Sequence, residues 1–398
     1  MKIETIKVKN FRAFKDMEMR DIPRFCVIAG ANGTGKSTLF QLFGFLKTAL
    51  KDNVRIALNK LGGARGFEEV RTRNSDGPIE ITLKFREEPS KPLITYELAI
   101  NVDENKRPFV EREGLKYRRG SKGKPWHFLK FDNGEGYAVT NEVDLDKIDD
   151  ETSLTRDFQS LKSPDILAIK GLAQFEKFRA VRALGDLVEK WYVSDFHITE
   201  ARLDSEADYA EHLSETGDNL PLVTQYLYGN HSEILDRICK RLSDIIPGLG
   251  SVEPKLTDEG KVLLKYRAKD FNEPFLSRYV SDGTIKAFAY LVLLNDPKPY
   301  PLLCVEEPEN QLYPTLLQEL AEEFRAYSER GEQVFVSTHS YEFLNAAQID
   351  EVFWLVKKGG VTTVKRASNN KEIQAMMRNN GDKMGRLWRE GFFEGAEP

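Results

Sequence analysis

The fold of this 398-residue sequence is decided by the stretch Gly30-Ala31-Asn32-Gly33-Thr34-Gly35-Lys36-Ser37. It directly follows the continuously apolar run 25–29, which is typical of a strand buried on both faces of a sheet. A helical pattern then covers residues 37–50. Glycines let a backbone approach phosphate oxygens closely, and the N–H groups at the start of a helix attract anions. The stretch therefore predicts a phosphate-binding loop between a buried strand and a helix.

The same stretch matches the motif GxxxxGK[ST] at every fixed position, which indicates ATP bound with Mg²⁺. We expect Lys36 to reach the β- and γ-phosphates and to assist catalysis, and the Ser37 hydroxyl to ligate Mg²⁺. The backbone from Gly30 to Ser37, together with Thr38, is expected to line the phosphate site.

A second motif places two carboxylates at the end of an apolar strand. Residues 302–305 are Leu-Leu-Cys-Val, and Glu306 and Glu307 follow them. P-loop ATPases place one such acid near the metal and another near the attacking water. We assign Glu306 to the Mg²⁺ side and Glu307 as the base that polarises the water.

Two further features have a plain structural interpretation when each is taken alone. Ser281 is a good N-cap for the apolar helix predicted after Asp282, and a capped helix is common. His339 follows the apolar strand 333–337, where a lone histidine is more often structural than catalytic.

The order of these motifs along the chain resembles that of ABC-type AAA-family ATPases of the RecF/SMC branch. The ATPase part of OLD (overcoming lysogenization defect) proteins is the most similar. The resemblance covers most of the chain and is carried by Val8-Lys9-Asn10-Phe11-Arg12-Ala13-Phe14, Ser281-Asp282-Gly283-Thr284, Glu306-Glu307-Pro308-Glu309-Asn310, Ser337-Thr338-His339-Ser340 and Leu387-Trp388-Arg389-Glu390-Gly391.

The resemblance implies a homodimer of two ATPase heads with ATP between them. Ser281 and Gly283 of one head would then complete the site formed by the P-loop of the other. His339 would contact the γ-phosphate or the attacking water. Two points depart from the family pattern: Glu306 stands where most ABC ATPases have Asp, and the Q-loop glutamine is either Gln159 or Gln174.

The remaining patterns predict an α/β ABC-ATPase head with a parallel core sheet, an antiparallel β lobe and a helical insertion. Period-two alternation and glycine-rich turns over residues 79–140 predict the antiparallel lobe. Alternating strands and helices from residue 250 onward predict the parallel sheet. We divide the chain into residues 1–150, a helical insertion over 151–248, and residues 249–398.

Composition excludes several classes of protein. The net charge is −5, so no global basic field attracts nucleic acid. Three cysteines far apart in the sequence do not form a disulfide framework, and no metal-ligand spacing occurs among cysteines and histidines. Because neither a signal peptide nor a membrane-spanning run is present, we expect a cytoplasmic protein with no membrane contact.

Three hypotheses about function remain open at this stage. Because the chain ends soon after the ATPase pattern, at Pro398, we expect no Toprim nuclease domain, and the first hypothesis is an ATP-driven sensor and scaffold of anti-phage defence. It would control a separately encoded effector, most simply a nuclease. The second is a RecF-like ATPase that holds nucleic acid through the basic hairpin 116–126. The third is a nucleotide-gated scaffold with little hydrolysis.

Overall fold

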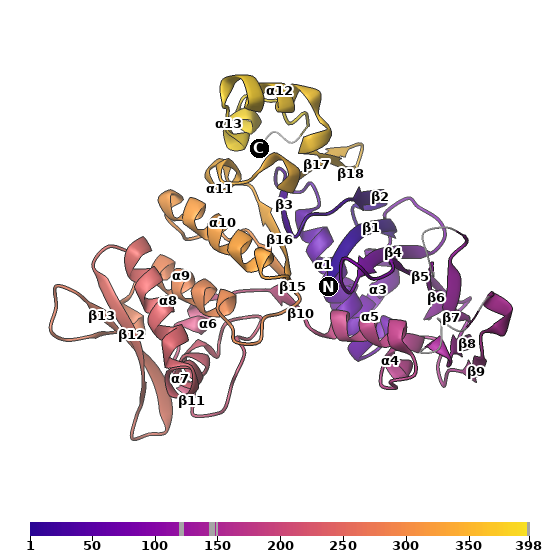
Figure 1. Ribbon diagram of the computed structural model, residues 1–398, viewed down its shortest axis with the longest axis horizontal. Coiled ribbons are helices and arrows are strands. Elements are labelled where there is room, and N and C mark those ends of the chain that lie inside the picture. The colour runs from indigo at the N-terminus through magenta and orange to yellow at the C-terminus, as the bar shows by residue number, and fades with distance from the viewer. Residues whose placement is uncertain (119–122, 143–147, 149, 396–398) are drawn as a thin grey trace.

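A computed structural model describes residues 1–118, 123–142, 148 and 150–395. Figure 1 shows a central parallel sheet from which three parts extend. An antiparallel sheet with its helices lies on one side, a helical part with a small sheet lies on the other, and the C-terminal helices lie at the top of the view. Among the described residues, no helix has the length and apolarity that crossing a membrane requires.

The central sheet has six strands in the order β10-β15-β16-β3-β17-β18. The first five are parallel and β18 is antiparallel to β17. Every residue of β3 is buried, as its continuous apolar sequence predicts. The strands are β3 (Phe25–Ala29), β10 (Trp191–Ser194), β15 (Leu302–Glu306), β16 (Gln333–Thr338), β17 (Val352–Lys358) and β18 (Val361–Arg366).

The second sheet is antiparallel and has eight strands in the order β2-β1-β4-β5-β6-β7-β8-β9. Alternating burial along β4 confirms the period-two pattern of its sequence. The strands are β1 (Lys2–Phe11), β2 (Phe14–Arg20), β4 (Ile79–Arg86), β5 (Ile94–Val102), β6 (Pro108–Tyr117), β7 (Trp126–Asp132), β8 (Glu135–Val139) and β9 (Arg156–Ser160).

A third, smaller sheet contains β11 (Ser205–Glu206), β12 (Leu249–Leu256), β13 (Lys261–Ala268) and β14 (Phe275–Leu276). The helices that follow the P-loop are α1 (Lys36–Lys51), α2 (Val54–Gly62) and α3 (Gly66–Val70). The middle of the chain contains α4 (Ala168–Leu172), α5 (Arg179–Glu189), α6 (Ile198–Ala201), α7 (Leu220–Asn230) and α8 (Ser232–Ile245). The last third contains α9 (Asp282–Leu294), α10 (Pro314–Glu329), α11 (Tyr341–Asn345), α12 (Lys371–Asn380) and α13 (Met384–Arg389).

Two hydrophobic cores lie on opposite faces of the central sheet. Alternate residues of β3 belong to different cores: Cys26 and Ile28 pack with α1 and the antiparallel sheet, whereas Phe25 and Val27 pack with α9 and α10. Because a strand points successive side chains to opposite faces, this division accounts for the apolar run that has no polar alternation.

The predicted helical insertion over residues 151–248 contains short strands as well as helices. It contains α4 to α8, but it also contains β9, which pairs with β8 in the antiparallel sheet, and β10, which pairs with β15 in the core. Strands of four or five residues give almost no periodicity, and their pairing partners are set by tertiary contacts. The boundaries at 150 and 248 remain predictions.

Candidate functional site

Three strands bring the predicted motifs to one edge of the central sheet. Ala29 of β3 pairs with Thr338 of β16, and Glu306 of β15 pairs with Ser337 of β16. The P-loop, the two carboxylates and His339 all follow the carboxyl ends of these parallel strands. Crevices at the carboxyl ends of parallel strands are where open α/β sheets bind ligands.

The P-loop is held in its curved form by hydrogen bonds from two elements. The Thr34 hydroxyl donates to the Ala31 carbonyl at 2.8 Å, and the buried Thr362 hydroxyl of β18 donates to the Thr34 carbonyl at 2.7 Å. Gly35 has φ of 105°, and a Cβ atom there would lie 3.3 Å from both the Ala13 Cβ and the Thr362 Oγ1. Gly35 is also the N-cap of α1 and offers no side chain, so the first N–H groups of α1 stay free for an anion.

The Lys36 ammonium lies at the centre of this loop and is nearly inaccessible to solvent. It donates to the Gly30 carbonyl at 2.8 Å and to the Ala31 carbonyl at 3.3 Å. Its Nζ also lies 3.5 Å from Oε1 of Glu307. The first residue of α1 therefore connects the P-loop to the end of β15.

Oxygen donors gather beside Ser37. The Ser37 hydroxyl hydrogen-bonds the Glu306 carboxylate, and Asp195 follows β10 next to Glu306 in the sheet. Burial, with the added charges of Glu307 and Asp195, raises the pKa of Glu306. Hard oxygen ligands of this kind suit Mg²⁺, which takes one or two carboxylates together with substrate phosphates and water.

No group of three His, Cys, Asp or Glu side chains with metal-binding geometry occurs in the part of the chain that the structure describes. An all-protein cage for a metal is therefore absent there, and the donors beside Ser37 fit a metal only when phosphates share it.

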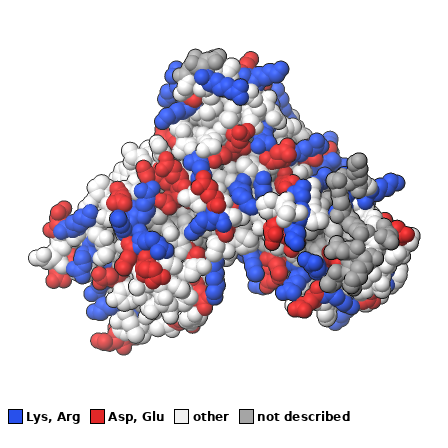
Figure 2. Space-filling model, viewed as in Figure 1, with Lys and Arg blue, Asp and Glu red and all other residues white. Residues whose placement is uncertain are grey.

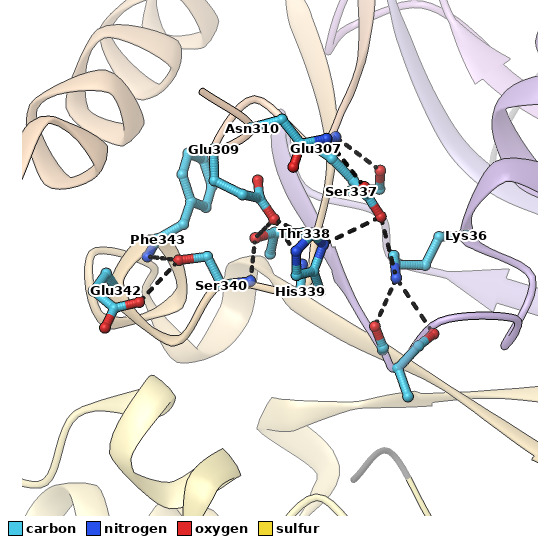
Figure 3. Close-up of polar contacts among 12 residues, drawn as sticks. Lys36, Glu307, Glu309, Asn310, Ser337, Thr338, His339, Ser340, Glu342 and Phe343 are labelled. Atoms are coloured by element: carbon cyan, nitrogen blue, oxygen red, sulfur yellow. Dashed lines mark hydrogen bonds and ion pairs between the residues drawn. The ribbon is translucent and has the colours of Figure 1, made fainter. Parts of the chain in front are cut away.

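Glu307 lies between two basic side chains, as Figure 3 shows. Its Oε1 is 3.2 Å from His339 Nδ1 as well as 3.5 Å from Lys36 Nζ, and Asn310 Nδ2 donates to Oε2 at 3.3 Å. Burial raises the pKa of this carboxyl, but the Asn310 hydrogen bond and the positive charges of His339 and Lys36 outweigh it and hold the pKa below its usual range. Glu307 is therefore ionised at neutral pH.

His339 is positioned by the buried side chain of Glu309. Its backbone N–H donates to Glu309 Oε1 at 2.8 Å, and the Thr338 hydroxyl donates to the same oxygen at 2.7 Å. The Glu307 N–H in turn donates to the Ser337 carbonyl at 3.0 Å. These contacts join the segments after β15 and β16 (Figure 3).

The cavity beside the P-loop has a volume of about 790 Å³. It is lined by Asn32, Gly33, Gly35, Lys36, Ser37, Thr38 and Glu307, by the cations Arg12, Lys15, Arg71, Arg73 and Lys357, and by the acid Glu69. A positively charged wall next to a helix N-terminus suits a polyphosphate.

Ser281 and Gly283 do not line this cavity of their own chain. The exposed Ser281 caps α9, where its hydroxyl accepts from the Thr284 N–H at 3.2 Å. Gly283 packs against the loop after β15, because a Cβ there would lie 2.9 Å from the Gln311 carbonyl oxygen. The predicted signature turn thus touches the loop that follows the two carboxylates.

Neither Q-loop candidate lies in this cavity. Gln159 is exposed on β9 and its amide donates to Asp157, whereas Gln174 follows α4 and lines a separate cavity with Lys47 and Lys51. Sequence reasoning missed the cations Lys15, Arg71, Arg73 and Lys357 of the cavity wall, and it also missed Gln41 and Asp195 near the P-loop and Glu306. The one signal for Asp195 is the short apolar run Trp-Tyr-Val before Ser194 and Asp195.

Comparison with protein families identifies the chain. The family described as "AAA domain, putative AbiEii toxin, Type IV TA system" matches residues 25–133 and 118–345. The chain belongs to this family. The AAA-domain family is one of nucleotide-binding ATPases. The P-loop and Glu307 lie within the matched residues, whereas Arg12, Lys15 and Lys357 of the cavity wall lie outside them. No curated protein sequence matches the chain.

One solved structure establishes the SMC-head fold. An SMC head bound to the C-winged helix domain of ScpA is 14% identical with a TM-score of 0.54, over 92% of this chain and 97% of that chain. An SMC head from Thermotoga maritima is 13% identical with a TM-score of 0.45, over 92% and 99%. A head with an extended coiled coil, bound to the C-terminal domain of ScpA and derived from Pyrococcus furiosus, is 14% identical with a TM-score of 0.49, over 95% and 99%. The fold assignment rests on the first, which confirms the α/β head expected from the motifs.

The hydrogen bond from Thr362 gives a first test of the site. Thr362→Val keeps the side-chain shape but removes the buried donor to the Thr34 carbonyl. The lost hydrogen bond contributes about 1 kcal/mol to the stability of the P-loop conformation. We expect the dissociation constant for Mg-nucleotide to rise about two- to fivefold in titration calorimetry. Thr363→Val, at the exposed neighbouring position, is the control. Equal affinities for the two variants would show that β18 does not support the loop.

Proposed function

We propose that this AAA-domain protein hydrolyses ATP with Mg²⁺ and that Glu307 is the general base. The observation that carries the proposal is the position of the Glu307 carboxylate, 3.5 Å from Lys36 Nζ and 3.2 Å from His339 Nδ1. An ionised carboxylate at the mouth of a P-loop can orient a water molecule and accept its proton. His339 is suited to contact the γ-phosphate or that water.

The other residues have binding roles in this proposal. Residues 30–37 and Thr38 would bind the phosphates through backbone N–H groups, and Lys36 would exchange its carbonyl contacts for phosphate oxygens. Ser37 and Glu306 would hold Mg²⁺, which neutralises charge that develops on the phosphates. Glu306 is one methylene longer than Asp, and its hydrogen bond to Ser37 supports a role at the metal.

The active form in this proposal is a homodimer in which ATP bridges two heads. Ser281 is exposed at the N-terminus of α9, and neither it nor Gly283 reaches the P-loop cavity of its own chain. A helix N-terminus is a good ligand for a phosphate. In a two-fold symmetric pair, each α9 could face the P-loop of the other chain.

For the biological role, we propose a cytoplasmic sensor and scaffold in anti-phage defence that controls a separate effector, most simply a nuclease. The AbiEii toxin and the type IV toxin–antitoxin system in the family description support it, as does the OLD-like order of motifs. The solved SMC head with its bound ScpA domain illustrates that this fold can carry a partner protein.

A second candidate function is nucleic-acid binding, as in a RecF-like ATPase. A hollow of about 980 Å³ on the antiparallel sheet supports it, because six cations and two acids line it: Lys7, Lys84, Arg86, Lys91, Lys116 and Arg118, with Glu18 and Glu97. Lys116 is paired with Glu97 at 2.8 Å. Of the predicted basic hairpin, Arg119 and residues 120–122 lie outside the described residues. Figure 2 shows mixed charge over the visible face.

Replacing the base is the direct test of hydrolysis. We expect Glu307→Gln to lower kcat for ATP by at least about 100-fold, because the amide cannot accept the proton, while ATP binding persists. Glu329→Gln, on the exposed end of α10, is the control. Equal rates in the wild type and Glu307→Gln would refute the assignment of the base. Tight ATP binding with negligible wild-type turnover would favour the nucleotide-gated scaffold.

The same variant tests the defence role. Cells that carry the chain with its neighbouring genes should survive phage challenge, and Glu307→Gln should remove the protection. Unchanged survival on deletion of the chain, with no partner recovered from such cells by affinity purification, would refute the role and leave the ATPase intact.

The shared site predicts a defect in dimerisation. In the Glu307→Gln background, sedimentation should detect a dimer with Mg-ATP, and Ser281→Arg should abolish it. The reason is that a long cationic side chain replaces the small N-cap of α9 next to the ATP between the two chains. Asn53→Arg removes the N-cap of α2 instead and should leave the dimer unchanged. An ATP-dependent dimer of the Ser281→Arg protein would contradict the bridging role.

The basic hollow predicts salt-dependent DNA binding. Lys84→Gln combined with Arg118→Gln should weaken binding to a duplex and lower the dependence of log K on log salt concentration by about two, one for each lost phosphate contact. Lys298→Gln, at an exposed site in the loop between α9 and β15 and outside the hollow, is the control. If the wild type binds no DNA at low salt, this candidate function is excluded.

A further inference from the structure

Lys286 is a buried lysine in the first turns of α9, and the mechanism above gives it no role. Only 5% of the residue is exposed. Its Nζ donates to the Asn310 carbonyl at 2.7 Å and lies 5.7 Å from the centre of the Tyr290 ring. Burying an ammonium costs free energy unless a specific contact compensates it. We therefore expect the contacts of Lys286 to serve the structure or the function of the site.

The carbonyl that Lys286 holds belongs to the loop that carries Glu307. Asn310 donates its side-chain amide to Glu307 Oε2 at 3.3 Å, and its backbone N–H donates to the Glu307 carbonyl at 3.1 Å. Glu307 and Gln311, at the two ends of this segment, both have positive φ, 41° and 67°. Such backbone conformations persist only where surrounding contacts hold them, and Lys286 supplies one of those contacts.

The same helix touches this loop at a second point. Gly283 packs so closely on the Gln311 carbonyl that a Cβ would lie 2.9 Å from it. Ser281, two residues earlier, is the cap that the proposed dimer places on the phosphate held by the other chain. In the proposed dimer, one helix would therefore have its N-terminus at one ATP site and its Lys286 at the loop of the other.

We propose that Lys286 is a positioning residue that couples the two ATP sites of the dimer. It would transmit a displacement of the α9 N-terminus to the carbonyl of Asn310 and, through the Asn310 amide, to the base Glu307. Occupation of one site by ATP would thus set the orientation of the base in the other. This inference rests on the proposed ATPase function and on the proposed dimer, and it assigns a connection between the two ATP sites.

Electrostatics agree with this geometry. Burial lowers the pKa of Lys286 to about 8, opposed by the charges of Glu309 and Glu307. The two carboxylates thus attract the ammonium, and Lys286 with Glu306, Glu307 and Asn310 lines a hollow of about 550 Å³.

The test compares Lys286→Met, which keeps length but removes the donor and charge, with Lys286→Arg, which keeps both and has room in the hollow. Lys170→Met is the matched control, because Lys170 also donates to a backbone carbonyl at 2.7 Å, that of Asp52, far from the site. Readouts are kcat and KM for ATP, the Kd for ATP in the Glu307→Gln background, and the melting temperature.

We expect Lys286→Met to lower kcat about 10- to 100-fold, as for a base displaced by about 1 Å, with the Kd for ATP within about twofold of the wild type. Lys286→Arg should recover most of kcat, and Lys170→Met should retain it. Asn310→Ala removes the side-chain amide that donates to Glu307. As a single variant it should lower kcat, and combined with Lys286→Met it should lower kcat little further.

A kcat for Lys286→Met equal to that of Lys170→Met would overturn the coupling, as would additive losses in the double variant. If Lys286→Met does not fold, the single variants Asn310→Ala and Lys286→Arg test the proposal instead. A kcat of Asn310→Ala equal to that of the wild type would then refute the link. An inactive wild type would instead refute the ATPase function on which the coupling rests, so the two failures are distinct.

Discussion

The contact between the Lys36 ammonium and the Glu307 carboxylate is the interaction on which the rest of the structure depends. It joins the first residue of α1 to the end of β15, and it is possible because β3 and β15 lie in one parallel sheet with their carboxyl ends together. That sheet must be covered on both faces, which accounts for the two hydrophobic cores and the all-apolar sequence of β3. The fold and the candidate site both follow from this arrangement of the central parallel sheet.

Local patterns were enough to predict the parts of this arrangement that are contiguous in sequence. The P-loop, the Glu306–Glu307 pair and the helix after Ser281 each sit on an apolar strand or helix whose periodicity is evident, and the structure has those elements. The order of the motifs then indicated the head fold. The catalytic roles of these residues remain proposals, since they depend on chemistry that geometry supports but does not measure.

Residues that act through tertiary contacts could not be found from the sequence. Asp195 follows a four-residue strand whose place next to β15 is set by packing, and Thr362 lies 328 residues from the carbonyl it holds. In the sequence, Lys286 is one cation on an apolar helix, and no local pattern indicates the Asn310 carbonyl to which it donates. Neither Gln159 nor Gln174 is near the P-loop, because the segment that contains them belongs to the antiparallel sheet and α4.

The central claim is that the P-loop is half of a site shared between two chains. Mixing Lys36→Met protein with Ser281→Arg protein tests it most directly, because each alone lacks one half and a mixed dimer regains one complete site. The account predicts ATPase activity in an equal mixture that neither protein has alone, since only a mixed dimer contains one intact site. A mixture as inactive as its two components would contradict the shared site.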